Sequence, residues 1–124
     1  MSSRSVMDLS PAMRQKVSMW EVLMLKDDID YLITCTRRSL EEQKRLYAQG
    51  RTIPGKKVTW TLKSKHITGD AFDFVIMVDG KPDWKMAHKD SWDKAVEFGK
   101  NLGLAQVIDK NGKVKEYAHL QMIA

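Results

Sequence analysis

The sequence predicts an α+β fold, in which helices pack on a small antiparallel sheet within a single domain spanning residues 1–124. Three segments combine helix-capping residues with apolar side chains at helical spacing, and four apolar runs are typical of strands. Asp79-Gly80 and Asn111-Gly112 are turn signals of the kind that join neighbouring antiparallel strands. A chain of 124 residues can build one modest core, and neither a repeat nor a linker divides it.

The formal net charge of +5 suits an anionic partner, either a nucleic acid or an acidic cell-wall polymer. The basic residues are scattered among acidic ones and form no recognised nucleic-acid-binding motif, so we expect no nucleic-acid partner. The N-terminal segment is polar and no apolar run reaches a membrane-spanning length. We therefore expect no membrane segment and a chain that is cytoplasmic at synthesis.

Ser10-Pro11 predicts the start of the first helix, because serine caps helices and proline suits the first helical position. Residues 27–28 end this helix, and residues 29–36 are predicted to form a strand. The single cysteine, Cys35, lies in that strand and is predicted to be a buried structural thiol. Four apolar residues share one face of the helix, which we interpret as core rather than as a cofactor site: Met13, Val17, Trp20 and Met24.

The Ser-Leu-Glu-Glu run at residues 39–42 is a capping box, which predicts a second helix that ends near Gln49. Arg38 directly precedes this helix at the mouth of a strand, where side chains often face a cleft. Solvated charges are the default interpretation of both Arg37 and Arg38. Residues 51–63 form a loop rich in glycine, proline and lysine, which we expect to be one wall of that cleft.

The run from Ser64 to Asp73 contains the residues best suited to bind a metal ion. His66 and Asp73 offer an imidazole nitrogen and a carboxylate oxygen, both of which zinc accepts; a satisfied surface pair is the alternative interpretation. His119 would complete three protein ligands and leave a fourth position open for water, as in catalytic rather than structural zinc sites. Glu116 would then be the carboxylate that such a water needs.

Other polar residues near this run receive simpler interpretations. Gly69 permits a tight turn before the next strand, and Asp70 is interpreted as an exposed loop carboxylate. His88 lies in an irregular polar stretch, so we expect it to be solvated and not to be a ligand. Either Asp90 or Ser91 is predicted to cap the third helix.

The geometry of the last predicted strand raises a difficulty for the metal site. In a regular strand alternate side chains face opposite ways, so Glu116 and His119 would lie on opposite faces of the sheet. A bulge, twist or bend must intervene if both residues serve one site. The strands predicted after the first are residues 71–78, 104–108 and 114–122.

Three short motifs follow one another along the chain: Arg-Ser-x-x-x-Gln from Arg38, Ser-x-His-x-x-Gly-x-Ala-x-Asp from Ser64, and Glu-x-x-His from Glu116. From about Thr34 to Gln121 this order resembles the lysostaphin/D-Ala-D-Ala metallopeptidase superfamily, and within it the VanY-like and L-alanyl-D-glutamate peptidases of phage endolysins. The resemblance implies a zinc ion held by His66, Asp73 and His119, with Glu116 as general base and Arg38 as the arginine that binds and steadies the substrate. Gln43 matches the glutamine of the family pattern and is interpreted as substrate-binding. The Ser64 hydroxyl could hold a substrate carbonyl or merely fix the turn.

The sequence departs from the family pattern near its end. Residues 104–108 lack the Trp-Gly pair that many relatives carry before the last strand. Glu116 stands where many endolysins have aspartate, and Ala118 replaces the usual proline before the final histidine. These differences bear on the shape of the substrate pocket.

The resemblance implies a single zinc peptidase domain that hydrolyses the peptidoglycan stem peptide with a metal-activated water, between L-alanine and D-glutamate. Such a phage lysin is expected to be a monomer that stays in the host cytoplasm after synthesis and acts on the cell wall after release. Two alternatives are open: a D-Ala-D-Ala carboxypeptidase or dipeptidase, and a non-catalytic module that binds cell-wall peptides.

Overall fold

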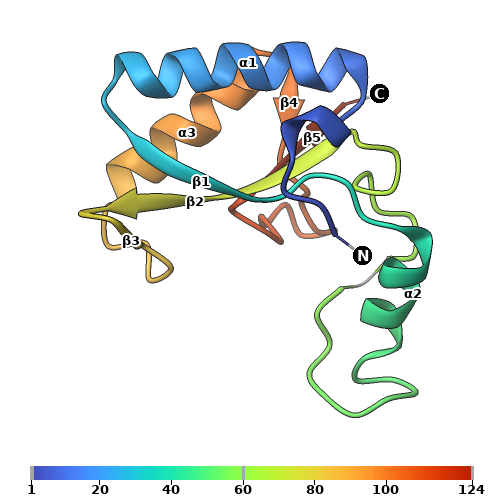
Figure 1. The fold of residues 1–124 in the computed structure, drawn as a ribbon. Helices are drawn as coiled ribbons and strands as arrows, with labels where there is room; N and C mark the ends of the chain where they lie inside the picture. The colour runs from blue at the N-terminus through green and yellow to red at the C-terminus, as the bar shows by residue number, and fades with distance from the viewer. Residues whose placement is uncertain (1, 60, 124) are drawn as a thin grey trace.

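The computed structural model describes residues 2–59 and 61–123, and these form three α-helices, a short 3-10 helix and a five-stranded antiparallel sheet. Helices α1 and α3 lie over one face of the sheet, whereas α2 projects from the body together with the loop that follows it (Figure 1). The predicted α+β class is therefore confirmed. In chain order the elements are η1 (Val6–Asp8), α1 (Pro11–Lys26), β1 (Asp30–Cys35), α2 (Leu40–Ala48), β2 (Ala71–Val78), β3 (Lys81–Pro82), α3 (Lys89–Asn101), β4 (Leu104–Ala105) and β5 (His119–Met122).

Strand β2 is central to the sheet, whose order is β1-β2-β5-β4, with β3 paired to the far end of β2. Asp73 of β2 lies opposite Cys35 of β1 on one side and His119 of β5 on the other. Residues directly opposite on neighbouring strands project from the same face of a sheet, whereas successive residues project from opposite faces. Cys35, Asp73 and His119 therefore form a row on one face, and Phe72 and Phe74 belong to the other.

The face that carries Phe72 and Phe74 is the core. The Trp20 ring of α1 lies 5.1 Å from the Phe72 ring, and the Trp92 ring of α3 lies 5.6 Å from the Phe74 ring. The Trp20 indole nitrogen also donates a hydrogen bond of 2.8 Å to the Ala95 carbonyl, which ties α1 to α3. Each such buried aromatic side chain contributes about 1.5–3 kcal/mol of hydrophobic stabilisation. Packing both helices on this face leaves the Asp73 face for the functional site.

Helix α1 begins at Pro11 as predicted, and its cap also holds the loop that precedes β2. The Ser10 hydroxyl accepts a hydrogen bond from the Met13 amide (3.3 Å) and donates one to an Asp70 carboxylate oxygen (2.7 Å). The Thr68 hydroxyl donates to the other Asp70 oxygen at 2.7 Å. The hydrogen bond from Ser10 is the main reason why the pKa of Asp70 is lower than usual. Asp70 is thus an anchor for the loop, which corrects its interpretation as an exposed carboxylate.

Helix α3 begins at Lys89, slightly earlier than the predicted cap at Asp90 or Ser91. His88 is the residue at the cap position and makes no side-chain capping bond. Asp83 instead accepts a hydrogen bond from the His88 backbone amide at 2.9 Å, and its carboxylate lies 3.5 Å from the His88 ring. His88 is half exposed and does not line the main cavity described below.

The closing strand is shorter than predicted. Strand β5 begins only at His119, because residues 117–118 form a turn, and Val114 makes only an isolated bridge to Ile108. The strand predicted at residues 104–108 is likewise reduced to the two residues of β4 and that bridge. Trp60, in the predicted cleft loop, lies outside the described residues. Among the described helices, none combines the length and apolar character needed to span a bilayer.

Two glycines with the same backbone conformation make a matched test of the fold. Gly69 and Gly80 both have φ of +76°, but a Cβ on Gly69 would stand 2.9 Å from the Ser10 nitrogen and 3.0 Å from the Asp8 carbonyl, whereas one on Gly80 would meet nothing within 4 Å. We expect Gly80→Ala to cost about 1–2 kcal/mol of left-handed strain. Gly69→Ala adds a forced backbone shift, for about 3–5 kcal/mol in all. Urea denaturation of both variants measures the difference, and equal losses would contradict the close packing of the loop on α1.

Candidate active site

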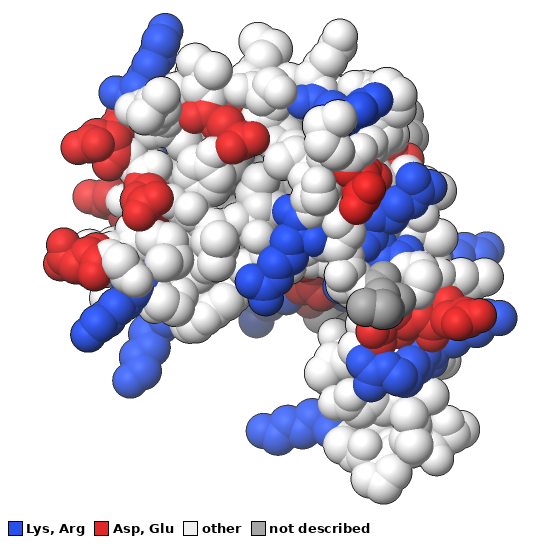
Figure 2. All heavy atoms as spheres, in the orientation of Figure 1, with Lys and Arg blue, Asp and Glu red and all other residues white. Residues whose placement is uncertain are grey.

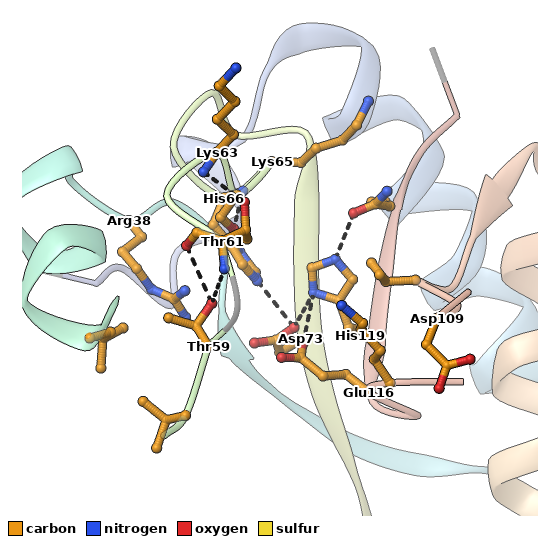
Figure 3. A pocket seen from close by; sticks show the side chains of 16 residues that line it. Arg38, Thr59, Thr61, Lys63, Lys65, His66, Asp73, Asp109, Glu116 and His119 are labelled. Carbon is orange, nitrogen blue, oxygen red and sulfur yellow. Dashed lines mark hydrogen bonds and ion pairs between the residues drawn. The ribbon is translucent and has the colours of Figure 1, made fainter. Parts of the chain in front are cut away.

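A cavity of about 780 Å³ opens on the sheet face that carries Asp73. One wall is the arm, which we define as α2 with the described residues of 49–63, and Figure 2 shows the molecule hollowed between this arm and the body. The other walls are the loop before β2 and the segment that leads into β5 (Figure 3). The cavity lining includes most of the predicted site residues: Arg38, Ser64, His66, Asp73, Glu116 and His119.

His66 and His119 face the same carboxylate oxygen. The Oδ1 atom of Asp73 lies 3.1 Å from Nε2 of His66 and 2.8 Å from Nδ1 of His119. The two imidazole rings meet nearly edge to face, with centroids 4.9 Å apart and planes at 80°. Both rings are buried. The structure thus brings the three predicted metal ligands to one oxygen of Asp73. His119 does so although it follows Asp73 by 46 residues in the sequence.

The orientation of each imidazole ring is set by a partner on its far side. Nδ1 of His66 lies 2.7 Å from the Thr36 carbonyl, which can only accept, so this nitrogen carries a proton and Nε2 is the nitrogen that faces the cavity. Nε2 of His119 lies 3.0 Å from Oε1 of Gln121 and donates to it, which leaves Nδ1 for the cavity. Metal-binding histidines typically have such partners, which fix the tautomer and the direction of the free nitrogen.

Sequence reasoning did not assign Gln121 or the Thr36 carbonyl to the site. Gln121 could have been found, because it stands two residues after His119 on the same strand and therefore on the same face. Thr36 could not, because its carbonyl approaches His66 only through the fold, 30 residues away in sequence.

The electrostatics of the histidine–aspartate cluster favour a cation. Burial opposes the charging of His66, but the hydrogen bond and charge of Asp73 outweigh it and raise the pKa of His66 to about 10. Burial likewise opposes ionisation of Asp73, yet hydrogen bonds from His119 and His66 hold the pKa of that carboxyl far below its usual range. The site therefore stabilises a positive charge beside Asp73, which a proton on His66 or a metal ion in its place would supply.

The donor atoms form two overlapping groups, in each of which all atoms lie within 4.8 Å: Cys35, His66 and Asp73, and Asp73, Glu116 and His119. Cys35 is buried as predicted, with Sγ 3.7 Å from Nδ1 of His66. That nitrogen already bonds the Thr36 carbonyl, so Cys35 approaches the side of His66 that faces away from the cavity. The free nitrogens of both histidines face Asp73 instead. His66 and His119 belong to different groups, which Asp73 joins, so the donor types and their outer hydrogen bonds suit a divalent metal beside Asp73.

Glu116 lies beside His119, although a regular strand would have separated them. Its Oε2 atom is 3.5 Å from Nδ1 of His119, and its side chain is 54% exposed. The turn at residues 117–118 ends the extended chain before β5, so alternation does not apply between the two residues. This turn is the bend that a shared site required, and it leaves a carboxylate accessible to solvent at the edge of the cluster.

Arg38 lines the cavity and is held in place by a buried side chain, that of Gln43. Its Nη1 atom donates a hydrogen bond of 2.8 Å to Oε1 of Gln43, which is fully buried in α2. The Gln43 amide nitrogen donates to the Thr61 carbonyl (2.7 Å) and to the Thr59 hydroxyl (3.2 Å). Gln43 does not line the cavity, because its amide is used to hold Arg38 and the arm loop together. Its position therefore suits a support for Arg38 and not the direct substrate contact that the resemblance implied.

Ser64 and Arg37 occupy different places around the cavity. Ser64 lines it, and its hydroxyl accepts a hydrogen bond of 3.2 Å from the His66 backbone amide, which fixes the turn. Arg37 is exposed and its Nε atom points to the Ile67 carbonyl at 3.4 Å, outside the main cavity. Of the two neighbouring arginines, Arg38 is the one that the structure brings to the site.

An antiparallel sheet that brings His66, Asp73 and His119 together beside Glu116 agrees with the lysostaphin/VanY-like metallopeptidase superfamily, to which the matches to known proteins assign the chain. Within that class the chain belongs to the phage L-alanyl-D-glutamate peptidase family, whose model matches residues 1–121. The family consists of peptidoglycan peptidases, which are hydrolases and typically depend on a metal.

Relatives agree with this assignment. The chain is 36% identical over 125 residues to the peptidoglycan L-alanyl-D-glutamate endopeptidase CwlK of Bacillus subtilis (strain 168), covering 94% of this chain and 74% of CwlK. The L-Ala D-Glu endopeptidase ChiX of Serratia marcescens has the same fold, with a TM-score of 0.63 and 19% identity over 98% of this chain and 88% of ChiX. The D,D-dipeptidase VanXYg has it too, with a TM-score of 0.66 and 18% identity over 94% of this chain and 51% of VanXYg.

Proposed function

We propose that this protein is a zinc-dependent endopeptidase that cuts peptidoglycan stem peptides between L-alanine and D-glutamate. The observation that carries the proposal is the approach of one nitrogen each from His66 and His119 to Asp73, with the Glu116 carboxylate 3.5 Å from His119. Membership of the phage L-alanyl-D-glutamate peptidase family and the similarity to CwlK support this choice of bond.

The residues that would hold zinc are His66, Asp73 and His119, whose nitrogen and oxygen donors suit this ion. When bound, zinc lowers the pKa of a coordinated water toward ~7 and polarises the scissile carbonyl. Gln121 and the Thr36 carbonyl keep the two imidazoles oriented toward the ion. Burial of both histidine rings limits competing contacts with bulk water.

Glu116 and Arg38 would act on the substrate. The half-exposed Glu116 carboxylate takes a proton from the attacking water and later delivers it to the leaving amine. The Arg38 guanidinium positions the substrate and steadies the negative charge that develops on the carbonyl oxygen, with Gln43 fixing its direction. Ser64 lines the same cavity and offers a hydroxyl to a substrate carbonyl.

The choice of bond also follows from what a lysin must achieve. The bond between L-alanine and D-glutamate joins each stem to its glycan, so cutting it opens the mesh, whereas removing a terminal D-alanine leaves existing crosslinks intact. We propose that the protein acts as a monomer, stays in the host cytoplasm after synthesis and reaches the wall after release. Its net charge of +5 would favour the anionic envelope, and the attraction weakens as salt rises.

Digestion of purified sacculi tests this proposal. We expect the turbidity of the sacculi to fall and new N-terminal glutamate to appear, identified by mass spectrometry after labelling of free amino groups. A parallel incubation with a soluble pentapeptide is the control for carboxypeptidase activity. Free D-alanine with intact sacculi would contradict the proposal and indicate a carboxypeptidase. Binding to sacculi without any new amino group would indicate a non-catalytic wall-peptide module.

A further inference from the structure

The carboxylates that line the cavity all have partners within the domain. Asp73 lies between two histidines, and Glu116 lies 3.5 Å from His119. Asp109 is turned into its own loop, where one carboxylate oxygen accepts the backbone amides of Asn111 and Lys113 at 2.8 and 2.9 Å. Each of these carboxylates therefore has a partner within the domain, although Glu116 stays half exposed.

The lysines of the same cavity are in the opposite situation. Lys63, Lys65 and Lys115 line it, and we call them the lysine rim. Within residues 2–59 and 61–123, none of these three ammonium groups makes an ion pair within 4.0 Å. The charge of Lys65 helps to lower the pKa of Asp70, but by less than the hydrogen bonds from Ser10 and Thr68 do. The unpaired charge of the cavity is thus positive.

The lysine rim is attached next to the reacting groups. Lys65 directly precedes His66, and Lys115 directly precedes Glu116, so cationic side chains stand on two different walls of the site. Figure 3 shows Lys63 and Lys65 extending outward from the loop beside His66, with their ammonium ends turned away from Asp73. The Debye length is about 8–10 Å at 0.1–0.15 M ionic strength and longer at low salt, so charges within this range act on an anionic group of the substrate with little screening. A substrate with a carboxylate close to the scissile bond would therefore be favoured.

We propose that the lysine rim recognises the free α-carboxylate of D-glutamate and makes the enzyme selective for stem peptides in which this group is not amidated. The inference rests on the proposed cleavage of the L-alanyl-D-glutamate bond. In the stem peptide D-glutamate continues the chain through its side-chain carboxyl, so its α-carboxylate stays free on the carbon that bears the scissile nitrogen. Conversion to the α-carboxamide removes this charge with almost no change in shape, and the lysine rim then loses its partner.

Two soluble stem peptides that differ only in this group, the α-carboxylate and the α-carboxamide, test the proposal. Dissociation constants measured by calorimetry on zinc-loaded protein with Glu116→Gln, which slows cleavage of the peptides, should show the acid binding about tenfold more tightly at low salt. The preference should shrink as ionic strength rises. Adding Lys65→Gln and Lys115→Gln should abolish most of the preference. The matched control is Lys110→Gln with Lys113→Gln, which removes the same net charge outside the cavity and should leave the preference unchanged.

The outcomes separate this inference from the proposed function. If the protein with an unsubstituted lysine rim binds the acid and the amide equally tightly, the rim has no such role. The same follows if the preference for the acid survives the loss of Lys65 and Lys115. If the protein with Glu116 intact cleaves both peptides equally well and binds them equally, the endopeptidase function stands and the selectivity fails. If it cleaves neither peptide but still prefers the acid through the rim, the selectivity stands and the cleavage proposal fails.

Discussion

Replacing His66 with alanine is expected to remove the bound metal and to lower turnover by about 10³-fold or more, the effect of losing several kcal/mol of metal-assisted catalysis. His66 supplies one of the two imidazole nitrogens that face Asp73, and its ring is fixed by the Thr36 carbonyl. Elemental analysis of the purified protein should find about one zinc ion per chain in the parent and almost none in the variant.

His88→Ala is the matched control for this experiment. His88 is half exposed, pairs with Asp83 and does not line the cavity, so its loss should leave metal content and turnover near the parent values. Because His66→Ala leaves the buried Thr36 carbonyl without its donor, circular dichroism must show that the variant is folded, and His66→Gln offers a second variant that fills the space. Equal loss of metal in the His66 and His88 variants would mean that the ligand set is wrong.

Local signals in the sequence were sufficient for the elements that carry most of the site. Ser10-Pro11 placed the start of α1, and the apolar run at residues 71–78 matches β2 residue for residue. Both depend on neighbouring residues: a cap bonds to an amide three positions away, and a buried strand needs only a continuous apolar run. The position of Asp73 within β2 could therefore be predicted, and with it the centre of the candidate metal site.

Contacts between distant segments could not be predicted in the same way. Asp70 bonds to Ser10 across 60 residues, and nothing in the loop itself indicates that this carboxylate is occupied. Gln43 carries a polar side chain on a helix, where exposure is the ordinary outcome, yet it is fully buried because two segments, at Arg38 and at residues 59 and 61, converge on its amide. The roles of such polar residues depend on tertiary partners, which periodicity does not encode.

The turn at residues 117–118 is the feature on which the proposed role of Glu116 depends. Alternation along a strand predicted that Glu116 and His119 would face opposite ways, and only the late start of β5 removes that conflict. The same turn leaves the Glu116 carboxylate half exposed, whereas the carboxylate of Asp73 is held between two histidines. Of these two acidic residues, Glu116 is the one that is free to exchange protons with water and substrate.

Glu116→Gln is therefore expected to lower kcat by about 10²–10⁴-fold, the usual contribution of a general acid–base residue, while zinc content and stability stay near the parent values. Glutamine keeps the size and a hydrogen-bonding oxygen but cannot take up the proton of the attacking water. The measurement is the rate of release of N-terminal glutamate from a soluble stem peptide, with zinc determined on the same samples. Glu116→Asp, the residue of many endolysins at this position, should retain much more activity because it keeps the carboxylate.

Asp109→Asn is the matched control, because Asp109 also lines the cavity but uses its carboxylate within its own loop, at Asn111 and Lys113. Its turnover should change little. If the Glu116→Gln variant cuts the peptide at nearly the parent rate, another carboxylate is the base. The turnover of Asp109→Asn then shows whether that base is Asp109. If the variant loses zinc, Glu116 is a ligand, as its place in a donor group with Asp73 and His119 would allow. Loss of turnover with zinc retained is the one result that assigns Glu116 the proton, since it separates the chemical step from the binding of the metal.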